Sequence, residues 1–303
     1  MIDVTNAVYK DAIDRTFGKY LSMEGVENVN VNRPYEVFCE FGGGVRERFE
    51  DKSLSLTALQ TFAELVATAN GQFYDPEIAT LSAKLPDGTR VEIFQSNAVG
   101  SGFSAALRKR YPGRFQLKDY GFKNKEIEWL IDSVINRKTM LVSGGTSTGK
   151  TTVLEILCGY IPKQRRLITI QDPKEIDFGI PNILDIALTE TDFEKRKKQL
   201  QAIAATAMRQ NPDSVIIGEI RESVMASAFR QLSNTGHPGS MASIHANDPQ
   251  SAIARMANLI QEQTGGVRDV IVYELKDAID YIIQIEKNKD GTRSAYIEEI
   301  SNP

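Results

Sequence analysis

The sequence predicts an α/β protein in which a parallel sheet forms the larger, carboxyl-terminal part and a smaller α+β domain precedes it. Three observations support this fold class. Apolar, strand-like segments alternate with helical ones from residue 124 onward, whereas residues 1–99 mix helices with strands around tight turns. The composition, 41% hydrophobic and 25% charged, is that of an ordinary globular protein. The 303 residues are enough for about two domains.

The amino-terminal domain, residues 1–99, is expected to contain two helices and several short strands. Apolar residues recur at helical spacing in residues 5–20 and again in residues 53–69. Between them, residues 26–49 alternate apolar and polar side chains, which predicts strands joined by a turn. A Pro-Asp-Gly turn at residues 86–88 separates two further strands, because glycine tolerates a positive φ there.

The rest of the chain divides into a linker and the larger domain. Residues 100–123 are rich in glycine, serine and basic side chains and lack a regular pattern, so we expect an interdomain linker. In residues 124–303 strands alternate with helices, which predicts a parallel sheet covered on both faces. A hairpin around Asp290 and Gly291 closes this domain. The charged run at residues 194–198 is expected to be a solvated helix face.

Charge and cysteine content restrict the class of function. The formal net charge of -4 offers no bulk attraction for a polyanion, so no specific nucleic acid is expected as a partner. Cys39 and Cys158 are far apart, which favours a reducing compartment over a metal site or disulfide framework. No apolar run approaches the ~18 to 20 residues that span a bilayer, and the first residues are too polar for a signal peptide. We expect the protein to stay in the compartment that makes it, unless a partner holds it at a membrane.

A phosphate-binding loop is predicted at residues 144–151, which match GxxxxGK[ST] between an apolar strand and a helix. Glycines let backbone N–H groups turn toward phosphate oxygens, and the helix N-terminus adds positive potential. Lys150 would neutralise the outer phosphates and Thr151 would ligate Mg²⁺. The residues expected to contact the nucleotide are Gly144, Gly145, Thr146, Ser147, Thr148, Gly149, Lys150, Thr151 and Thr152.

Two further apolar strands end in acidic residues. The strand over residues 213–219 ends in Glu219, and ligands gather at the carboxyl ends of parallel strands, so Glu219 is expected beside the phosphates and metal. The strand that begins at residue 166 is followed by Asp172 and Glu175. These two acids could position Mg²⁺ and polarise the attacking water, or could form a solvated turn. Both interpretations of the pair remain open.

The chain has two histidines, and both lie within residues 235–247. Either alone would more often be a packing residue than a ligand. Together in a segment with Gly236 and Gly239, His237 and His245 favour a site near the γ-phosphate. A metal pair is not expected, because no third ligand at suitable spacing is present.

These four motifs occur in the order GGTSTGKT, ITIQDPKEI, NPDSVIIGEIR and TGHPGSMASIHAN, and together they closely resemble those of the secretion or traffic ATPases. That family comprises hexameric motors of type IV secretion and conjugation, type II secretion and type IV pili. The resemblance covers most of residues 139–260 by motif, and VNRPYEVF resembles the family's small domain more loosely. Without clustered cysteines, and with one small amino-terminal domain, the chain looks most like the type IV secretion branch.

The resemblance implies a RecA-like P-loop domain, a homo-oligomer of six copies, and ATP with Mg²⁺ bound between the two domains. By motif position, Glu219 would be the Walker B glutamate and His245 the histidine that senses nucleotide state, while Asp172 would help to hold Mg²⁺. Arg108 and Arg110 lie where the family has basic residues that reach the nucleotide between domains.

One position departs from the family's pattern, since relatives usually have an acid where this chain has Gln171. A glutamine cannot be a general base, although it could orient water by hydrogen bonding. Glu175 and Glu219 are therefore the two candidates for the base, and the sequence does not choose between them.

The predicted function is an ATPase motor that drives substrate export or pilus assembly. It would act in the cytoplasm, peripherally at the inner face of the cytoplasmic membrane, with membrane-associated secretion or pilus proteins as partners. Alternatives left open are a pilus retraction motor and a nucleotide-binding switch with little hydrolysis, marked by Gln171. A RecA-like DNA translocase is disfavoured by the mild acidity of the chain.

Overall fold

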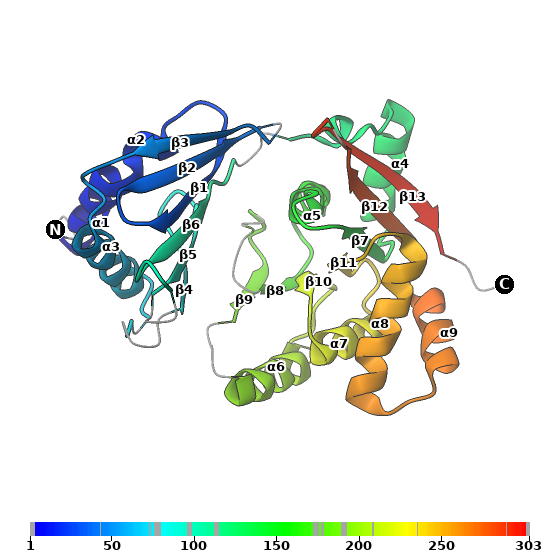
Figure 1. The fold of residues 1–303 in the computed structure, drawn as a ribbon. Coiled ribbons are helices and arrows are strands. Elements are labelled where there is room, and N and C mark those ends of the chain that lie inside the picture. Colours follow the sequence, from blue (N-terminus) through cyan, green and yellow to red (C-terminus); the bar gives the residue numbers. More distant parts are fainter. Residues whose placement is uncertain are drawn as a thin grey trace. The chain divides into compact units, whose positions relative to one another are not determined.

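The computed structural model shows a chain of two compact units, Met1–Arg114 and Phe115–Pro303 (Figure 1). No helix in the described part of the chain is both long and apolar enough to cross a membrane. The described residues are 4–300 except residues 43, 73, 76–79, 96–98, 112–114, 172–175, 177–178, 189–192, 208, 235 and 289.

The amino-terminal unit contains a six-stranded antiparallel sheet in the order β3-β2-β1-β6-β5-β4. Its strands are β1 (Val26–Arg33), β2 (Glu36–Phe41), β3 (Arg46–Glu50), β4 (Thr80–Lys84), β5 (Arg90–Phe94) and β6 (Ser104–Arg108). Its helical segments are α1 (Val4–Ile13), the π-helical turn η1 (Asp14–Gly18), α2 (Lys19–Leu21) and α3 (Leu56–Ala69).

Helix α3 closes the core of this unit. It begins where the Ser55 hydroxyl accepts a hydrogen bond from the Ala58 amide at 3.2 Å, which satisfies a backbone donor of the first turn. Leu59, Phe62 and Val66 recur at helical spacing and are fully buried. The ring of Phe62 packs edge-on against a second buried ring, Phe17, with 4.8 Å between the centroids.

The prediction that residues 100–123 form an interdomain linker is wrong for residues 104–108. These residues form strand β6 of the amino-terminal sheet. Ala105 and Leu107 are buried while Ala106 and Arg108 are exposed, so the segment has the period of two that a strand requires. Leu107 pairs with Val29 on one side and Val91 on the other, which makes β6 a central strand. The surrounding glycines and basic residues concealed this short alternation.

The carboxyl-terminal unit contains a seven-stranded sheet in the order β13-β12-β7-β11-β10-β8-β9, parallel except for β13. Its strands are β7 (Met140–Gly144), β8 (Leu167–Gln171), β9 (Ile183–Ala187), β10 (Ser214–Ile220), β11 (Met241–His245), β12 (Tyr281–Lys287) and β13 (Arg293–Glu299). Its helices are η2 (Leu117–Tyr120), α4 (Asn124–Ile135), α5 (Lys150–Cys158), α6 (Phe193–Ala207), α7 (Ser223–Asn234), α8 (Pro249–Thr264) and α9 (Arg268–Ala278).

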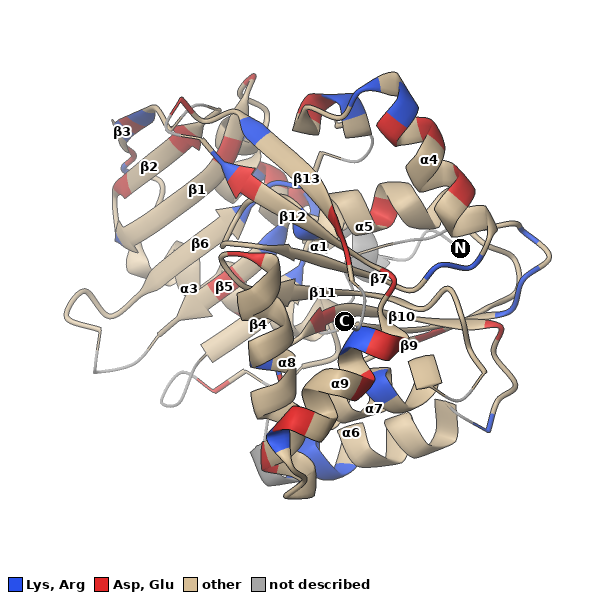
Figure 2. Cartoon of the chain, turned by 90° about the vertical axis from the view of Figure 1, so that its right-hand side faces the viewer, with Lys and Arg blue, Asp and Glu red and all other residues tan. Residues whose placement is uncertain are grey.

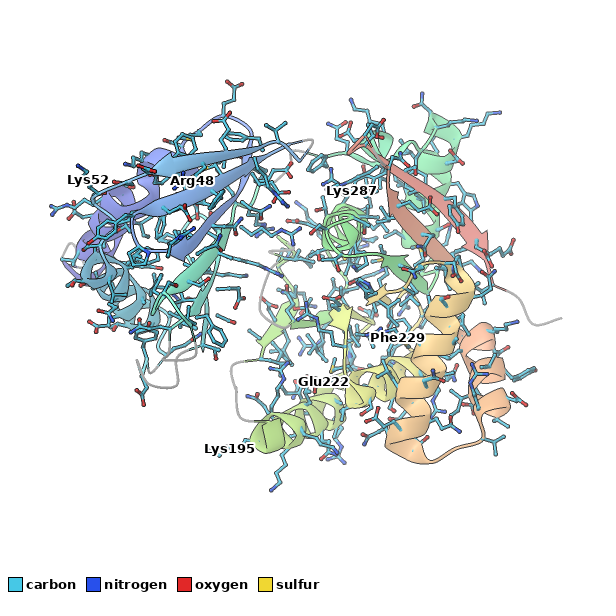
Figure 3. All side chains as sticks on the ribbon, in the orientation of Figure 1. Arg48, Lys52, Lys195, Glu222, Phe229 and Lys287 are labelled. Carbon is cyan, nitrogen blue, oxygen red and sulfur yellow. The ribbon has the colours of Figure 1, made fainter. Side chains whose placement is uncertain are left out.

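Helices cover both faces of this sheet, as predicted, and the alternating residues of β7 show it. Leu141 packs in a cluster with Phe229 of α7, which is buried beside the sheet (Figure 3). Met140 and Val142 pack in a separate cluster with Leu154 of α5. The central strands are therefore buried on both sides, which is why they read as continuous apolar runs. The predicted α/β fold class is confirmed.

The charged side chains of this unit are interspersed by sign. Figure 2 shows acidic and basic residues together on α4 and again on α9. Neither helix presents a continuous basic face of the kind that tracks a nucleic-acid backbone. The expectation that no specific nucleic acid binds stays a prediction.

Candidate nucleotide-binding site

The predicted motifs meet at the carboxyl edge of the parallel sheet. Strand β7 ends at Gly144, which pairs across the sheet with His245 at the end of β11. Strands β10 and β8 also run in parallel, and they end near Glu219 and at Gln171. Residues 144–151, Glu219 and His245 therefore share the edge where parallel sheets bind ligands.

Two glycines of the phosphate loop are required by close contacts. A Cβ atom on Gly144 would lie 2.6 Å from the Ile285 carbonyl oxygen, on the neighbouring strand β12. A Cβ atom on Gly149 would lie 2.4 Å from the Tyr120 hydroxyl, and Gly149 also has a φ of +102° that disfavours other residues. Both positions hold the loop backbone tightly against its surroundings.

Lys150 lies inside the loop rather than in solvent. Its side chain is buried, and its ammonium donates a hydrogen bond to the Gly145 carbonyl oxygen at 2.9 Å. The Thr148 hydroxyl donates to the same oxygen at 3.0 Å. Thr146 and Ser147 form the exposed tip, and Ser147 has a positive φ of 61°. The curled loop thus surrounds the lysine that would meet the phosphates.

Helix α5 starts at Lys150, so its first turn carries the remaining predicted contacts, Thr151 and Thr152. Both threonines are partly buried. The free N–H groups of this turn and the helix dipole favour an anion at this position. The curled loop, the buried lysine and the helix N-terminus together fit the phosphates of a nucleoside triphosphate.

Tyr120 is a residue of this site that sequence analysis missed, since it lies in the segment expected to be a linker. It is fully buried at the end of η2, and its hydroxyl donates to the Gly149 carbonyl oxygen at 3.4 Å. A hydrogen bond also joins it to the Thr152 side chain, and burial raises the pKa of the phenol, which therefore stays protonated. Tyr120 supports the loop and the first turn of α5 from behind.

Glu219 stands on a β-bulge. Residues 217–220 of β10 lie opposite residues 242–244 of β11, so β10 contains one extra residue here. The Ser243 hydroxyl donates to the Gly218 carbonyl oxygen at 2.6 Å and fixes the bulged backbone. Bulges of this kind redirect side chains and are common beside active sites. The glutamate accepts from Arg221 Nε at 2.9 Å.

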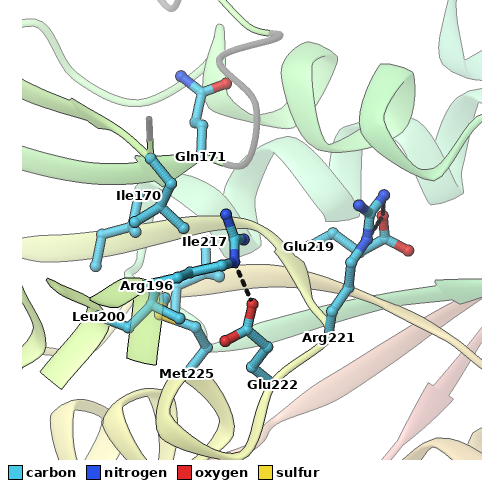
Figure 4. Close-up of a pocket in the computed structure, with 10 residues that line it drawn as sticks. Ile170, Gln171, Arg196, Leu200, Ile217, Glu219, Arg221, Glu222 and Met225 are labelled. Carbon is cyan, nitrogen blue, oxygen red and sulfur yellow. Dashed lines mark hydrogen bonds and ion pairs between the residues drawn. The ribbon is translucent and has the colours of Figure 1, made fainter. Parts of the chain in front are cut away.

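Glu219 and side chains of helix α6 line the same small pocket (Figure 4). Arg196 of α6 reaches into it and forms an ion pair with Glu222 at 2.8 Å. The run at residues 194–198 was expected to be a solvated face. Lys195 is exposed, as that expectation requires (Figure 3), but Arg196 is mostly buried. The side chains that line the pocket are Ile170, Gln171, Leu188, Arg196, Leu200, Ile217, Glu219, Arg221, Glu222 and Met225.

Gln171 does not present its amide to solvent. Its side chain is 2% exposed and is hydrogen-bonded to the backbone of Ile176 and to the carboxylate of Asp185. The expectation that Gln171 could orient a water is therefore wrong for this arrangement. The predicted acids Asp172 and Glu175 lie outside the described residues.

The two histidines lie at opposite ends of β11, so the expectation that both flank the γ-phosphate is wrong for His237. His245 ends the strand beside the phosphate loop, whereas His237 precedes it. The Ser240 hydroxyl donates to the His237 carbonyl oxygen at 2.9 Å, in a turn bound by Arg137 at the amino edge of the sheet. Strand β11 runs from Met241 to His245, so it carries the second histidine away from the turn that holds His237.

Arg108 and Arg110 belong to the amino-terminal unit. Arg108 is exposed at the end of β6, and the side chain of Arg110 packs over Gly88 in the turn between β4 and β5. Their predicted contact with the nucleotide stays a prediction.

Comparisons with known proteins agree with these motifs. The family model described as type II/IV secretion system protein matches residues 14–290. The type IV secretion system protein VirB11 of Bartonella henselae is 27% identical, and the alignment covers 88% of this chain and 86% of that protein. A probable conjugal transfer protein TrbB of Sinorhizobium fredii is 28% identical, with 90% and 82% coverage.

Among solved structures, the pilus retraction motor PilT with bound ADP has a TM-score of 0.63 at 20% identity, and the match covers 98% of this chain and 83% of PilT. At this identity the likeness shows the fold alone. The family match spans most of the chain and includes every motif of the site. This chain belongs to the type II/IV secretion system protein family.

Proposed function

We propose that this protein is the ATP-hydrolysing motor of a type IV secretion or conjugation-type system. The observation that carries the proposal is the phosphate loop with buried Lys150, which shares one sheet edge with Glu219 and His245. The similarity to VirB11 across most of both chains supports the type IV secretion assignment. The protein would act as a homohexamer at the inner face of the cytoplasmic membrane, bound to membrane-associated secretion proteins.

The residues of the site would divide the work as follows. Backbone N–H groups of the loop and the first turn of α5 would bind phosphate oxygens, and Lys150 would offset charge on the outer phosphates. Thr151 would hold Mg²⁺, which when bound neutralises phosphate charge. Asp172 would assist at the metal.

Glu219 would accept the proton of the attacking water, with Glu175 as the other candidate. The bulge at Gly218 aims the carboxylate, and one of its oxygens accepts from Arg221. His245 would sense the nucleotide state, because its strand is paired directly with the end of β7. Arg108 and Arg110 would stabilise phosphate charge from the amino-terminal unit.

ATP hydrolysis by the purified protein, measured beside Lys150→Ala, tests this proposal. We expect the substitution to reduce turnover by at least about 100-fold, because a positioned charge on the developing oxyanion is lost. Undiminished turnover in Lys150→Ala would refute the site. Lys125→Ala, an exposed lysine on α4, is the matched control and should leave turnover unchanged.

The oligomeric mass of the same samples, recorded with and without Mg·ATP, tests the ring. A hexamer that hydrolyses ATP supports the motor. A hexamer that binds ATP without any turnover would replace the motor with a nucleotide-dependent assembly switch.

A further inference from the structure

The carboxamide of Gln171 connects three parts of the carboxyl edge of the sheet. Gln171 ends β8, and its side chain is buried. Its Nε2 donates to the Ile176 carbonyl oxygen at 3.0 Å, and its Oε1 accepts from the Ile176 amide at 2.8 Å. Nε2 also donates to Asp185 Oδ1 on β9 at 2.9 Å. Both ends of the amide are thus bound to protein.

The register of β8 and β9 explains the meeting with Asp185. Asp185 pairs with Thr169, and Gln171 lies two residues further along β8, so the three side chains project from one face. The Thr169 hydroxyl also donates to Asp185 Oδ1. The carboxylate therefore serves as the acceptor for two neighbouring donors of β8.

The same glutamine lies beside the bulge that carries Glu219. Gln171 follows Ile170, which pairs with Ile217 of β10. A Cβ atom on Gly218 would lie 3.7 Å from both Cα and Cγ of Gln171, so a side chain at position 218 would meet this glutamine. Gln171 and Glu219 also line the same small pocket (Figure 4). A displacement of Gln171 would therefore change the position of the Glu219 carboxylate, which follows Gly218 in the chain.

An ionised acid could make only one of these three bonds. A glutamate at position 171 could accept from the Ile176 amide, but it would have no N–H group for the Ile176 carbonyl oxygen. It would also face the carboxylate of Asp185 within hydrogen-bond distance, where two negative charges repel each other. The neutral amide is the form that this arrangement of donors and acceptors requires.

We propose that Gln171 is a positioning residue, whose carboxamide joins β8, Ile176 and Asp185 of β9 and thereby holds the edge of the sheet on which Glu219 stands. This inference rests on the proposed ATPase function for its kinetic consequence. It gives the buried amide of Gln171 a structural role, with Asp185 as its partner.

The decisive experiment combines Gln171→Glu with Asp185→Asn. We expect Gln171→Glu to lower kcat by about 10-fold to 100-fold, as a displacement of about 1 Å at a catalytic group does, with little change in KM for ATP. The added Asp185→Asn offers an amide donor to the new carboxylate and removes the repulsion, so it should restore part of kcat, although the Ile176 carbonyl oxygen still lacks its donor. Gln201→Glu, the same change at an exposed site on α6, should have no effect.

The pH profile separates positioning from a general loss of structure. Two facing carboxylates raise the pKa of one of them, so a proton shared between them replaces the missing donor at low pH. The kcat of Gln171→Glu, relative to wild type, should therefore rise as pH falls, whereas the double variant should follow wild type. A pH-independent loss that Asp185→Asn does not repair would overturn the proposal, as would a single variant with wild-type kcat.

Hydrogen exchange at the Ile176 amide gives a readout that does not depend on turnover. This amide donates to Gln171 and should be protected in wild type. In Gln171→Glu, repulsion from the Asp185 carboxylate should displace the acceptor and lower the protection, and the double variant should recover it. If wild type hydrolyses no ATP, the proposed function fails while this test of the contact stands. If Gln171→Glu does not fold, Asp185→Ala removes the same side-chain contact. An unchanged kcat in an active background would then refute the inference.

Discussion

Two acidic residues, one in each unit, differ in how fully their carboxylates are bound. Asp51 of the amino-terminal unit is buried between β3 and α3. It accepts from the Lys19 ammonium at 2.6 Å, from the Tyr20 hydroxyl at 2.9 Å and from the amide and hydroxyl of Ser53 at 3.0 and 2.6 Å. Such a carboxylate has a structural role, because it links the chain segments that donate to it.

Glu219 of the carboxyl-terminal unit is bound through one oxygen. Its Oε2 accepts both contacts from Arg221, a residue two positions further along the chain and half exposed. The glutamate itself is 22% exposed in its side chain and lines a pocket. Asp51 is buried with both carboxylate oxygens bound, whereas Glu219 is partly exposed and its contacts with Arg221 use one oxygen, which is the arrangement of an acid that can take a proton.

The largest effect is expected at Glu219. Glu219→Gln keeps the size of the side chain but removes the proton acceptor, so turnover should fall by about 100-fold to 10,000-fold while ATP affinity stays close to wild type. Titration calorimetry beside a turnover assay measures both quantities. An equal loss of binding and turnover would mean that Glu219 is a structural acid like Asp51.

Asp51→Asn should destabilise the fold without changing ATP affinity. We expect the free energy of unfolding to fall by about 3 kcal/mol, because hydrogen bonds to a charged group contribute about 1.5 to 3 kcal/mol each. Denaturant unfolding followed in both units gives the value. The control is Asp11→Asn at an exposed ion pair with Arg15, which should cost at most about 1 kcal/mol.

The pH dependence of stability extends this comparison. Burial by itself would raise the pKa of Asp51, but donation from Lys19 and Ser53 outweighs burial and holds the pKa well below its usual range. The stabilisation is therefore complete above the unfolded value of about 3.9 and is lost as pH falls from there toward the folded pKa. Wild type should lose stability more steeply than Asp51→Asn below about pH 4. If the free energy of unfolding of the two proteins changed equally with pH in this range, the low pKa of Asp51 would be contradicted.

The smallest effect, a modest loss of ATP affinity, is expected from a change at Tyr120, which supports the phosphate loop. Tyr120→Phe removes one hydroxyl donor to the Gly149 carbonyl oxygen and keeps the ring, so ATP affinity should fall by about 1 kcal/mol, or roughly 5-fold. Tyr160→Phe, at an exposed tyrosine after α5, is the control. An affinity equal to wild type would mean that the ring alone supports Gly149.

Much of the site could be predicted from sequence because its chemistry is local. The phosphate loop needs glycines, a lysine and a threonine within eight consecutive residues, and the strand before it and helix after it are visible as patterns. The alternation of strands and helices likewise determined the parallel sheet, which brings Glu219 and His245 to the edge where the loop lies. These features follow from neighbours in the chain.

The tertiary structure decided the features that depend on distant partners. Gln171 meets Asp185, 14 residues away, because of the register of β8 and β9, and Tyr120 meets Gly149 because η2 packs behind the loop. His237 and His245 are close in sequence but lie at opposite ends of a strand. Periodicity predicts which face a residue takes, whereas register and packing, set by the whole fold, determine which side chain it meets.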